Sequence, residues 1–289
     1  MFPKDTIVSR ELRLRDCLYC ARRRYDANTK IVYVLAESWS VIPNIESSRE
    51  EDVLNIFSTL SEWPHDSWTT LSVYRDGDEV KAKPDEFEPH HLDKRMLLGE
   101  YPLFNYLELP VLETYQTRVF RVLLNDQRCF LKLARFPKDV RAIVKELRAY
   151  HTLTELLSNT APKLLGYACE GTADRVVGFF YEELVGRYPN CRDVQACERS
   201  LDRLHELGIY HGDIDRYNIV VTNNGRRAKF IDFEKSMVGP AGCDNEDFED
   251  RKDEESVELL GEVMNDYDNS TGPRVVENQG FLAGLRISL

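Results

Sequence analysis

The sequence predicts an α+β fold in which a β-rich portion precedes a helical portion, and three observations support that order. Apolar-rich runs at residues 106–111, 118–124 and 128–133 have the length and composition of strands. Apolar residues then recur at helical spacing between Pro137 and Tyr150. After two further strand-like runs, the remaining part of the chain carries mainly helical patterns.

The three strand-like runs lead directly into the first strongly predicted helix. Asn125, Asp126 and Gln127 form a turn between the second and third runs, which predicts an antiparallel meander. Pro137 and Asp139 then open the helix, in which five apolar residues recur at helical spacing: Val140, Ile143, Val144, Leu147 and Tyr150. One face of this helix is therefore predicted to be buried.

The elements after this helix change gradually from strands to helices. Strands are predicted at residues 163–168 and 176–184. A helix at residues 193–207 ends at Gly208, because glycine readily adopts the left-handed conformation that terminates helices. An acidic stretch at residues 244–258 leads into a last helix predicted at residues 254–264. We interpret this stretch as solvated, with attraction of a basic substrate or partner as the alternative.

Residues 1–100 are predicted to be an N-terminal extension or accessory module of unknown role. They combine a strand-like run at residues 30–36, a helix-like run at residues 49–60 and a turn-rich, charged stretch at residues 75–91. None of these patterns indicates chemistry. We expect the module to pack on the next domain, with docking of a protein partner as the alternative.

The charge balance argues against a protein that binds nucleic acid or an anionic membrane. The 289 residues carry a formal net charge of -12, whereas such binding needs broad basic patches. The densest basic cluster, residues 10–24, is interrupted by Glu11 and Asp16 and indicates a solvated face. With 42% hydrophobic residues, the composition is that of an ordinary globular protein.

Cysteine use and apolar runs favour a cytoplasmic protein, with the nucleus as the alternative. Seven scattered cysteines are an odd number in a chain that is long enough to need no disulfides. Cys17 and Cys20 form one C-x-x-C, but a zinc site would lack half of its ligands. Residues 1–15 have no apolar stretch of signal-peptide length, and the strongest apolar run, at residues 176–181, is too short to span a membrane.

The most specific signal lies between residues 204 and 234. Residues 204–221 read LHELGIYHGDIDRYNIVV, and residues 230–234 read FIDFE. Together they resemble the catalytic core of the protein-kinase-like superfamily. The His-Gly-Asp and Ile-Asp-Phe-Glu variants are similar to those of aminoglycoside-phosphotransferase-like and other atypical kinases, and the chain looks especially like a group of fungal kinase-like proteins.

This resemblance implies a two-lobed protein-kinase-like fold. The β-rich N-lobe would comprise residues 101–184, and a reduced helical C-lobe would comprise residues 185–289. The C-lobe is expected to be reduced because residues 184–211 are too few for the usual two helices.

The resemblance also implies ATP and Mg²⁺ as cofactors. Phosphoryl transfer needs one carboxylate to orient the acceptor hydroxyl, and an amide oxygen and a second carboxylate to hold Mg²⁺. Asp213 would act as the base, Asn218 and Asp232 would be the metal ligands, and His211 of the same motif joins the catalytic set. A hairpin through Gly225 would return Asp232 to the metal. Each residue alone indicates only a turn, so the prediction depends on the combination.

Upstream, the superfamily places a lysine on the third strand and a helix glutamate that holds it. Lys132 and Glu146 fit these positions. Lys132 lies inside an apolar strand, where an unpaired ammonium is costly to desolvate, so a carboxylate partner is expected. Glu155 is the other acidic candidate if the helix has a different register. The structural alternative is a lysine that extends to solvent and a solvated glutamate.

Residues of the fifth strand resemble the approach to the kinase hinge. Tyr181 would gate the adenine pocket, and backbone groups of Glu182 and Leu184 would meet adenine. Phe130, two residues before Lys132, stands where the family usually has a small residue, and it is expected to narrow the adenine pocket.

The sequence departs from the kinase pattern at three places. The expected glycine-rich phosphate loop, residues 112–117, contains no glycine, so hydroxyls of Thr114 or Thr117 would have to replace close backbone amides. Glu234 follows Phe233 in place of glycine, and Gly212 replaces the arginine that pairs with a phosphorylated loop in many kinases.

Two functions follow from these patterns. The first is a kinase that phosphorylates a hydroxyl group, with a small molecule favoured over a protein as the acceptor. The alternative is a pseudokinase, a nucleotide-binding or protein-interaction module without catalysis, whose partner would dock on residues 1–100.

Overall fold

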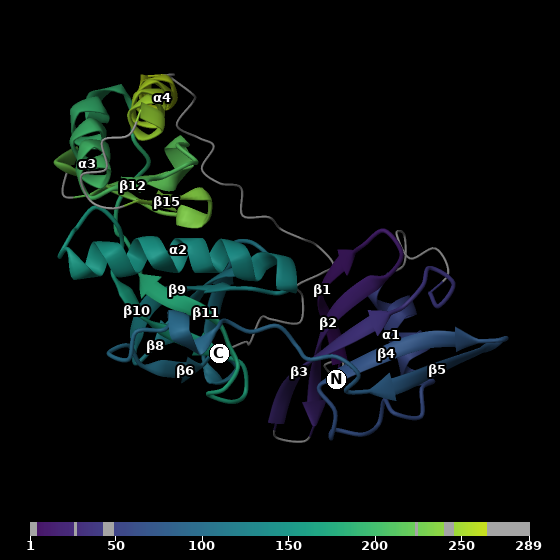
Figure 1. Ribbon diagram of the computed structural model, residues 1–289. Coiled ribbons are helices and arrows are strands. Elements are labelled where there is room, and N and C mark those ends of the chain that lie inside the picture. The colour runs from purple at the N-terminus through teal and green to yellow at the C-terminus, as the bar shows by residue number, and fades with distance from the viewer. Residues whose placement is uncertain (1–4, 26–27, 43–48, 223–224, 240–245, 265–289) are drawn as a thin grey trace.

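The computed structural model describes residues 5–25, 28–42, 49–222, 225–239 and 246–264. The fold is α+β, with 30% helix, 35% strand and mixed sheets. Two large sheets lie side by side. One long helix separates the second of these sheets from the helices of the C-terminal part (Figure 1). Residues 265–289 lie outside the described part of the chain.

Residues 5–84 form a five-stranded sheet and one helix. The strand order is β1-β2-β3-β4-β5, and only the β3–β4 pair is parallel. The elements are β1 (Asp5–Leu12), β2 (Cys17–Tyr25), β3 (Asn28–Ala36), α1 (Glu50–Ser58), β4 (Thr70–Asp76) and β5 (Glu79–Pro84). The turn-rich stretch predicted at residues 75–91 thus contains a regular β4–β5 hairpin.

The central strands of the five-stranded sheet are buried on both faces, whereas the edge strand β5 is largely exposed. On one face, Val53 and Phe57 of α1 join a core that includes Trp63 and Trp68. The other face contributes apolar side chains to a second cluster that contains Phe136, at the start of the central helix. Because this face is covered by the rest of the chain, residues 5–84 pack on the following part, as expected.

The two cysteines of the C-x-x-C lie in β2 and take part in packing. Cys17 belongs to the core under α1, whereas Cys20 belongs to the cluster on the opposite face, and both are fully buried. Their side chains therefore point to opposite sides of the sheet, as residues three apart on a strand must. Both thiols have a raised pKa because burial disfavours the thiolate.

A six-stranded sheet follows, in the order β6-β10-β11-β9-β8-β7. Only the β6–β10 pair is parallel. Its strands are β6 (Leu103–Asn105), β7 (Val111–Thr114), β8 (Val119–Leu124), β9 (Gln127–Leu133), β10 (Leu164–Cys169) and β11 (Val176–Glu182). Helix α2 (Pro137–Glu155) lies along this sheet, between it and the C-terminal helices (Figure 1).

The structure confirms the predicted meander and helix but corrects the first strand. Residues 106–111 were expected to be extended, yet Tyr106–Glu108 form a short 3₁₀ turn, and the strand begins only at Val111. The Asn105 side chain accepts a hydrogen bond from the Leu107 amide and so caps this turn. Pro110 has no amide hydrogen, which delays strand pairing further.

Within the described residues, the C-terminal part contains two helices and two short two-stranded sheets. Its elements are α3 (Val194–Glu206), β12 (Ile209–Tyr210), β13 (Ile219–Thr222), β14 (Arg227–Phe230), β15 (Met237–Val238) and α4 (Glu246–Met264). Gly208 ends α3 with a φ of 74°. The acidic stretch predicted as solvated is largely helical, with Glu255, Leu259 and Val263 buried.

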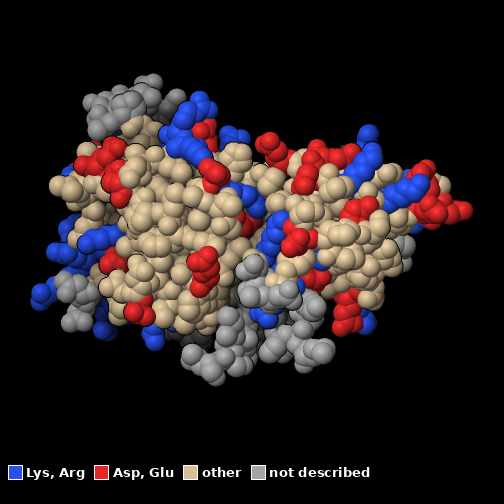
Figure 2. Space-filling model, turned by 90° about the horizontal axis from the view of Figure 1, so that it is seen from below, with Lys and Arg blue, Asp and Glu red and all other residues tan. Residues whose placement is uncertain are grey.

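Charge is unevenly distributed over the surface. Figure 2 shows one face of the molecule, on which acidic side chains gather at the end formed by the β4–β5 hairpin. Asp76 and Glu79 of this hairpin are exposed. Within the described chain, Lys81 is the cation that forms ion pairs with them. None of the described helices combines the length and the apolar character needed to cross a bilayer.

Candidate phosphoryl-transfer site

Lys132 is the centre of the candidate site. Its Nζ lies 2.7 Å from Oε2 of Glu146, 2.7 Å from Oδ1 of Asp232 and 3.1 Å from Oε1 of Glu234. The lysine side chain is 6% exposed and that of Glu146 is 1% exposed. The contact predicted between Lys132 and Glu146 is therefore present, and two further carboxylates join it.

The short connection between β9 and α2 explains why Lys132 and Glu146 meet. Asp139, in the first turn of α2, accepts hydrogen bonds from the backbone amides of Arg135 and Phe136 at 3.0 Å, which fixes the start of the helix. In this register Glu146 lies on the buried face of α2. Glu155 is exposed, so the alternative register is wrong.

Charge and burial oppose each other in this cluster. Burial alone would lower the pKa of Lys132, but Glu146, Asp232 and Glu234 together hold it above its ordinary value. Burial raises the pKa of Glu146 to about 7, and the ammonium of Lys132 opposes that rise. The pKa of Asp232 is lowered, because Lys132 outweighs the effect of burial. The cluster thus keeps Asp232 ionised.

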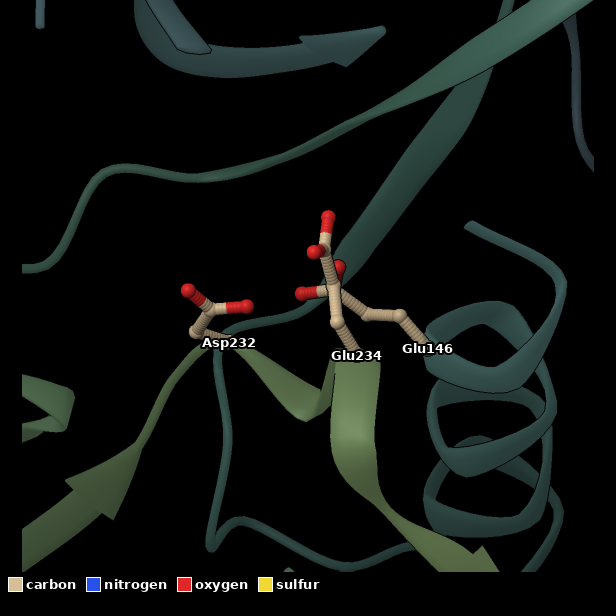
Figure 3. Close-up of side chains that lie close together, drawn as sticks. All are labelled: Glu146, Asp232 and Glu234. Carbon is tan, nitrogen blue, oxygen red and sulfur yellow. The ribbon is translucent and has the colours of Figure 1, made fainter. Parts of the chain in front are cut away.

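Figure 3 shows how the three carboxylates converge. Glu146 reaches in from α2, while Asp232 and Glu234 come from the segment after β14. One oxygen from each of the three lies within 4.8 Å of the others. Lys132 already contacts all three, so their mutual repulsion is offset by the ammonium.

The backbone at Asp232 is held in an unusual conformation. Its φ is 66° and its ψ is 65°, in the left-handed region that costs a non-glycine residue energy. The backbone amide of the next residue, Phe233, donates to Oε1 of Glu146 at 3.3 Å. One glutamate therefore holds both the lysine of β9 and the turn that carries Asp232.

Asp213 lies at the open side of the site. Its Oδ1 is 2.7 Å from Nζ of Lys235, and the two side chains are 36% and 65% exposed. Gly212 has a φ of 77°, and a Cβ at this position would lie 2.5 Å from the carbonyl oxygen of Lys235. Glycine at 212 thus lets the Asp213 loop approach the segment that carries Lys235.

His211 does not lie where it could contact a substrate. Its side chain is fully buried, and Nε2 donates to the carbonyl of Ile231 at 3.0 Å. Its ring packs against Phe233 with centroids 4.8 Å apart. The catalytic role predicted for His211 is therefore corrected to a positioning role, because the ring supports the loop from beneath.

Glu255 of α4 supports the same loop, and no motif in the sequence predicted it. Its carboxylate accepts hydrogen bonds from the backbone amides of His211 at 3.2 Å and Gly212 at 2.6 Å. His205 Nε2 lies 2.8 Å from the same carboxylate. The sequence indicated only that Glu255 lies on the helix predicted at residues 254–264. The other acidic residues around it gave no reason to single it out.

Two hydrogen bonds tie Asn218 to Asp213 and to Ile231, the residue before Asp232. Its Nδ2 donates to the carbonyl of Asp213 at 3.0 Å, and the amide of Ile231 donates to the carbonyl of Asn218 at 2.9 Å. Pairing of Ile219 with Phe230 confirms the predicted hairpin, whose residues 223–224 lie outside the described chain. The first bond leaves Oδ1 of Asn218 as its candidate ligand atom. Together with the ionised Asp232, it is an oxygen set of the kind that Mg²⁺ prefers.

Aromatic rings pack on one another at the position where the sequence predicted an adenine pocket. Phe130 stacks on Tyr181 with centroids 5.5 Å apart and an interplanar angle of 16°, and Tyr115 packs on Phe130 at 5.3 Å. The Glu182 amide donates to the carbonyl of Lys163 at 2.9 Å, so this amide is already occupied and cannot make the predicted contact. Leu184 is half-buried just after β11.

The turn without glycine, between β7 and β8, reaches the site through Arg118. Its Nε donates to the carbonyl of Leu133 at 3.0 Å, and its guanidinium forms an ion pair with Glu234. A second guanidinium nitrogen lies 3.5 Å from Asp139. The sequence suggested that the hydroxyl of Thr114 or Thr117 would contact the phosphates. In the structure, the residue next to this turn that contacts the carboxylates around Lys132 is Arg118. The sequence offered no signal for it.

A scan against models of known protein families matches none of them to this chain, and a search of curated proteins finds no significant match. The site must therefore be interpreted from its own geometry.

Proposed function

We propose that the chain is an ATP- and Mg²⁺-dependent phosphotransferase of the protein-kinase-like type, which transfers a phosphoryl group to a hydroxyl. One observation carries this proposal: Nζ of Lys132 lies 2.7 Å from both Glu146 and Asp232. A buried lysine, held by a helix carboxylate beside a second, ionised carboxylate, is the arrangement that places nucleotide phosphates next to a metal ligand.

The architecture supports the same proposal. The six-stranded sheet with α2 would form the N-lobe, and the part that carries α3 and α4 would form the C-lobe. Lys132 and Glu146 belong to the first part, whereas Asp213, Asn218 and Asp232 belong to the second. The proposed site thus lies where the two lobes meet, and each lobe alone carries only part of it.

In the proposed reaction, the side chains orient two substrates and move one proton. Asp213 accepts the proton of the acceptor hydroxyl while the hydroxyl oxygen forms a bond to the γ-phosphorus of ATP. The bond between this phosphorus and the departing ADP breaks in the same step. Lys132 neutralises charge on the phosphates. Oδ1 of Asn218 and the carboxylate of Asp232 would hold Mg²⁺, which neutralises further phosphate charge when it is bound.

A small hydroxyl-bearing molecule is the acceptor that we favour. Asp213 is 36% exposed, so a free hydroxyl can reach it from solvent. Among the described residues the C-terminal part contains two helices, α3 and α4, which offer little surface for an extended protein substrate. Pocket shape rather than a peptide groove would then select the substrate.

A nucleotide-binding or protein-interaction module without catalysis is the second candidate. The observation that favours it is the ring stack of Tyr115, Phe130 and Tyr181, which occupies space where adenine would lie. In this case the retained ion cluster at Lys132 would serve stability alone, and partners would dock on the five-stranded sheet or its helix.

Two measurements test the proposal. ATP with Mg²⁺ should raise the melting temperature by mass action, whereas no shift at millimolar nucleotide would favour the second candidate. ATP turnover should fall by about 100-fold or more in Asp213→Ala and Asp232→Asn. Asp202→Ala removes an exposed carboxylate from α3 and serves as the control. Equal turnover in all four proteins would remove the proposed roles.

A further inference from the structure

We propose that Glu234 is an internal anion that occupies the phosphate position whenever no nucleotide is bound, and that Arg118 is the phosphate ligand that replaces the glycine-rich loop. This inference rests on the proposed function and deepens it. Its consequence is that nucleotide phosphates must displace the Glu234 carboxylate before they reach the two cations behind it.

The contacts of Glu234 resemble those of a bound phosphate oxygen. Its Oε1 lies 3.1 Å from Nζ of Lys132 and also pairs with the guanidinium of Arg118. These cations come from different elements, β9 and the turn before β8. A single oxygen that bridges a lysine and an arginine is what an incoming phosphate would provide.

Glu234 is the carboxylate of this cluster that is most easily withdrawn from Lys132. Glu146 and Asp232 satisfy the ammonium at 2.7 Å, whereas Glu234 adds a third and longer contact. Glu234 is 22% exposed, so its carboxylate has solvent to move into, whereas Glu146 is 1% exposed; Asp232 is 42% exposed but is held by the shorter contact with Lys132. When Glu234 moves away, Lys132 keeps its ion pairs with Glu146 and Asp232. No buried charge is then left without a partner at Lys132, so the cost of the movement is small.

The charge of the cluster also requires that an anion leave. Lys132 and Arg118 face four carboxylates, those of Glu146, Asp232, Glu234 and Asp139, an excess of two negative charges when all are ionised. A triphosphate added to this set would be repelled. Release of Glu234 lowers the repulsion and frees the guanidinium at the same time.

Arg118 is held ready for a new anion. Its Nε bond to the carbonyl of Leu133 and the 3.5 Å contact with Asp139 remain when Glu234 moves away. The guanidinium can then offer its remaining donors to phosphate oxygens in the forked geometry that suits them. This explains how phosphates can be held by a turn that contains no glycine.

The alternative role for Glu234 is that of an additional metal ligand beside Asp232, and it makes the opposite prediction. If Glu234 is an internal anion, its neutralisation should strengthen phosphate binding. If it is a metal ligand, neutralisation should weaken the binding of Mg²⁺-ATP.

Calorimetric titration of Glu234→Gln and Arg118→Gln separates these cases, with inorganic tripolyphosphate and with ATP, each with and without Mg²⁺. We expect Glu234→Gln to bind metal-free tripolyphosphate and ATP about tenfold more tightly than wild type, and Arg118→Gln to bind them about tenfold more weakly. Arg118→Lys should recover only part of the loss, because it lacks the fork. Glu206→Gln and Arg203→Gln, an exposed pair on α3, reproduce the charge changes as controls.

Unchanged or weaker tripolyphosphate binding in Glu234→Gln would overturn this inference, even if wild type turns over ATP. Tighter tripolyphosphate binding without any ATP turnover would keep the inference and remove the proposed catalysis. If neither probe binds to wild type or to Glu234→Gln, both ideas fall. Far-ultraviolet circular dichroism of each variant verifies folding, and Arg118→Gln alone decides the role of Arg118 if Glu234→Gln does not fold.

Discussion

Lys132 and Asp232 lie 100 positions apart in the chain, yet Nζ of the first is 2.7 Å from Oδ1 of the second. The contact joins β9 to the segment after β14. Asp232 is also held in a left-handed backbone conformation, which the surrounding contacts must stabilise.

Replacement of Lys132 by methionine should abolish most ATP turnover, by about 100-fold or more, because the phosphates lose their buried cation. It also leaves Glu146 and Asp232 without a counter-charge, so the melting temperature should fall. Arg141→Met removes an exposed cation from α2 and should change neither quantity. Turnover that survives in Lys132→Met would contradict the proposed role.

Replacement of Lys235 by methionine should reduce turnover by about tenfold while stability stays nearly constant. The pair of Lys235 with Asp213 is exposed, and such pairs contribute on the order of 0.5 kcal/mol. The pKa of Lys235 is raised by its hydrogen bond to Asp213, so the pair persists at neutral pH and holds the carboxylate in place. Steady-state kinetics should show the loss in kcat, with Lys235→Arg close to wild type. A loss confined to KM would instead indicate a role in binding.

Replacement of Glu255 by alanine should lower the free energy of unfolding by about 3 kcal/mol, because two backbone amides and His205 lose a buried partner. Glu254→Ala, at the exposed neighbouring position on α4, should cost less than about 0.5 kcal/mol. Urea unfolding of both variants measures the difference. Equal costs would show that Glu255 does not support the Asp213 loop.

Acidification should destabilise the protein partly through His211. Burial lowers the pKa of His211 against the opposing effect of Glu255, so the unfolded chain takes up this proton at higher pH than the folded chain. The free energy of unfolding that the neutral His211 contributes is therefore complete above the ordinary histidine pKa of about 6.5, and it is lost as pH falls below this value.

Urea unfolding between about pH 7.5 and about pH 5.5 tests this dependence. The free energy of unfolding should fall less in His211→Asn than in wild type. The other histidines with lowered pKa values, His90 and His151, remain in both proteins and cancel in the comparison. Identical slopes would mean that His211 does not titrate differently on folding.

Much of the local structure could be predicted from the sequence, because it depends on local patterns. The Asn125–Gln127 turn, the apolar spacing of α2 and the glycine after α3 each act over a few residues, and the structure has the corresponding elements. A carboxylate partner for Lys132 could also be predicted, because an ammonium inside an apolar strand requires one, and the resemblance to the kinase superfamily implied that this partner is Glu146. Residues 106–111 were the exception, since a side-chain cap at Asn105 outweighed strand propensity.

Only the tertiary structure decided how distant charges are paired. Nothing near Arg118 in the sequence indicates that it meets Glu234, 116 residues later, or that Glu255 supports the loop before Asp213. The sequence by itself determined the elements with strong local patterns, such as β8, β9, α2 and α3, and which carboxylates are available, because propensity and hydrophobic period are local. The packing of the sheets and helices determined which cation each carboxylate contacts, since ion pairing depends on distance in space and not on separation along the chain.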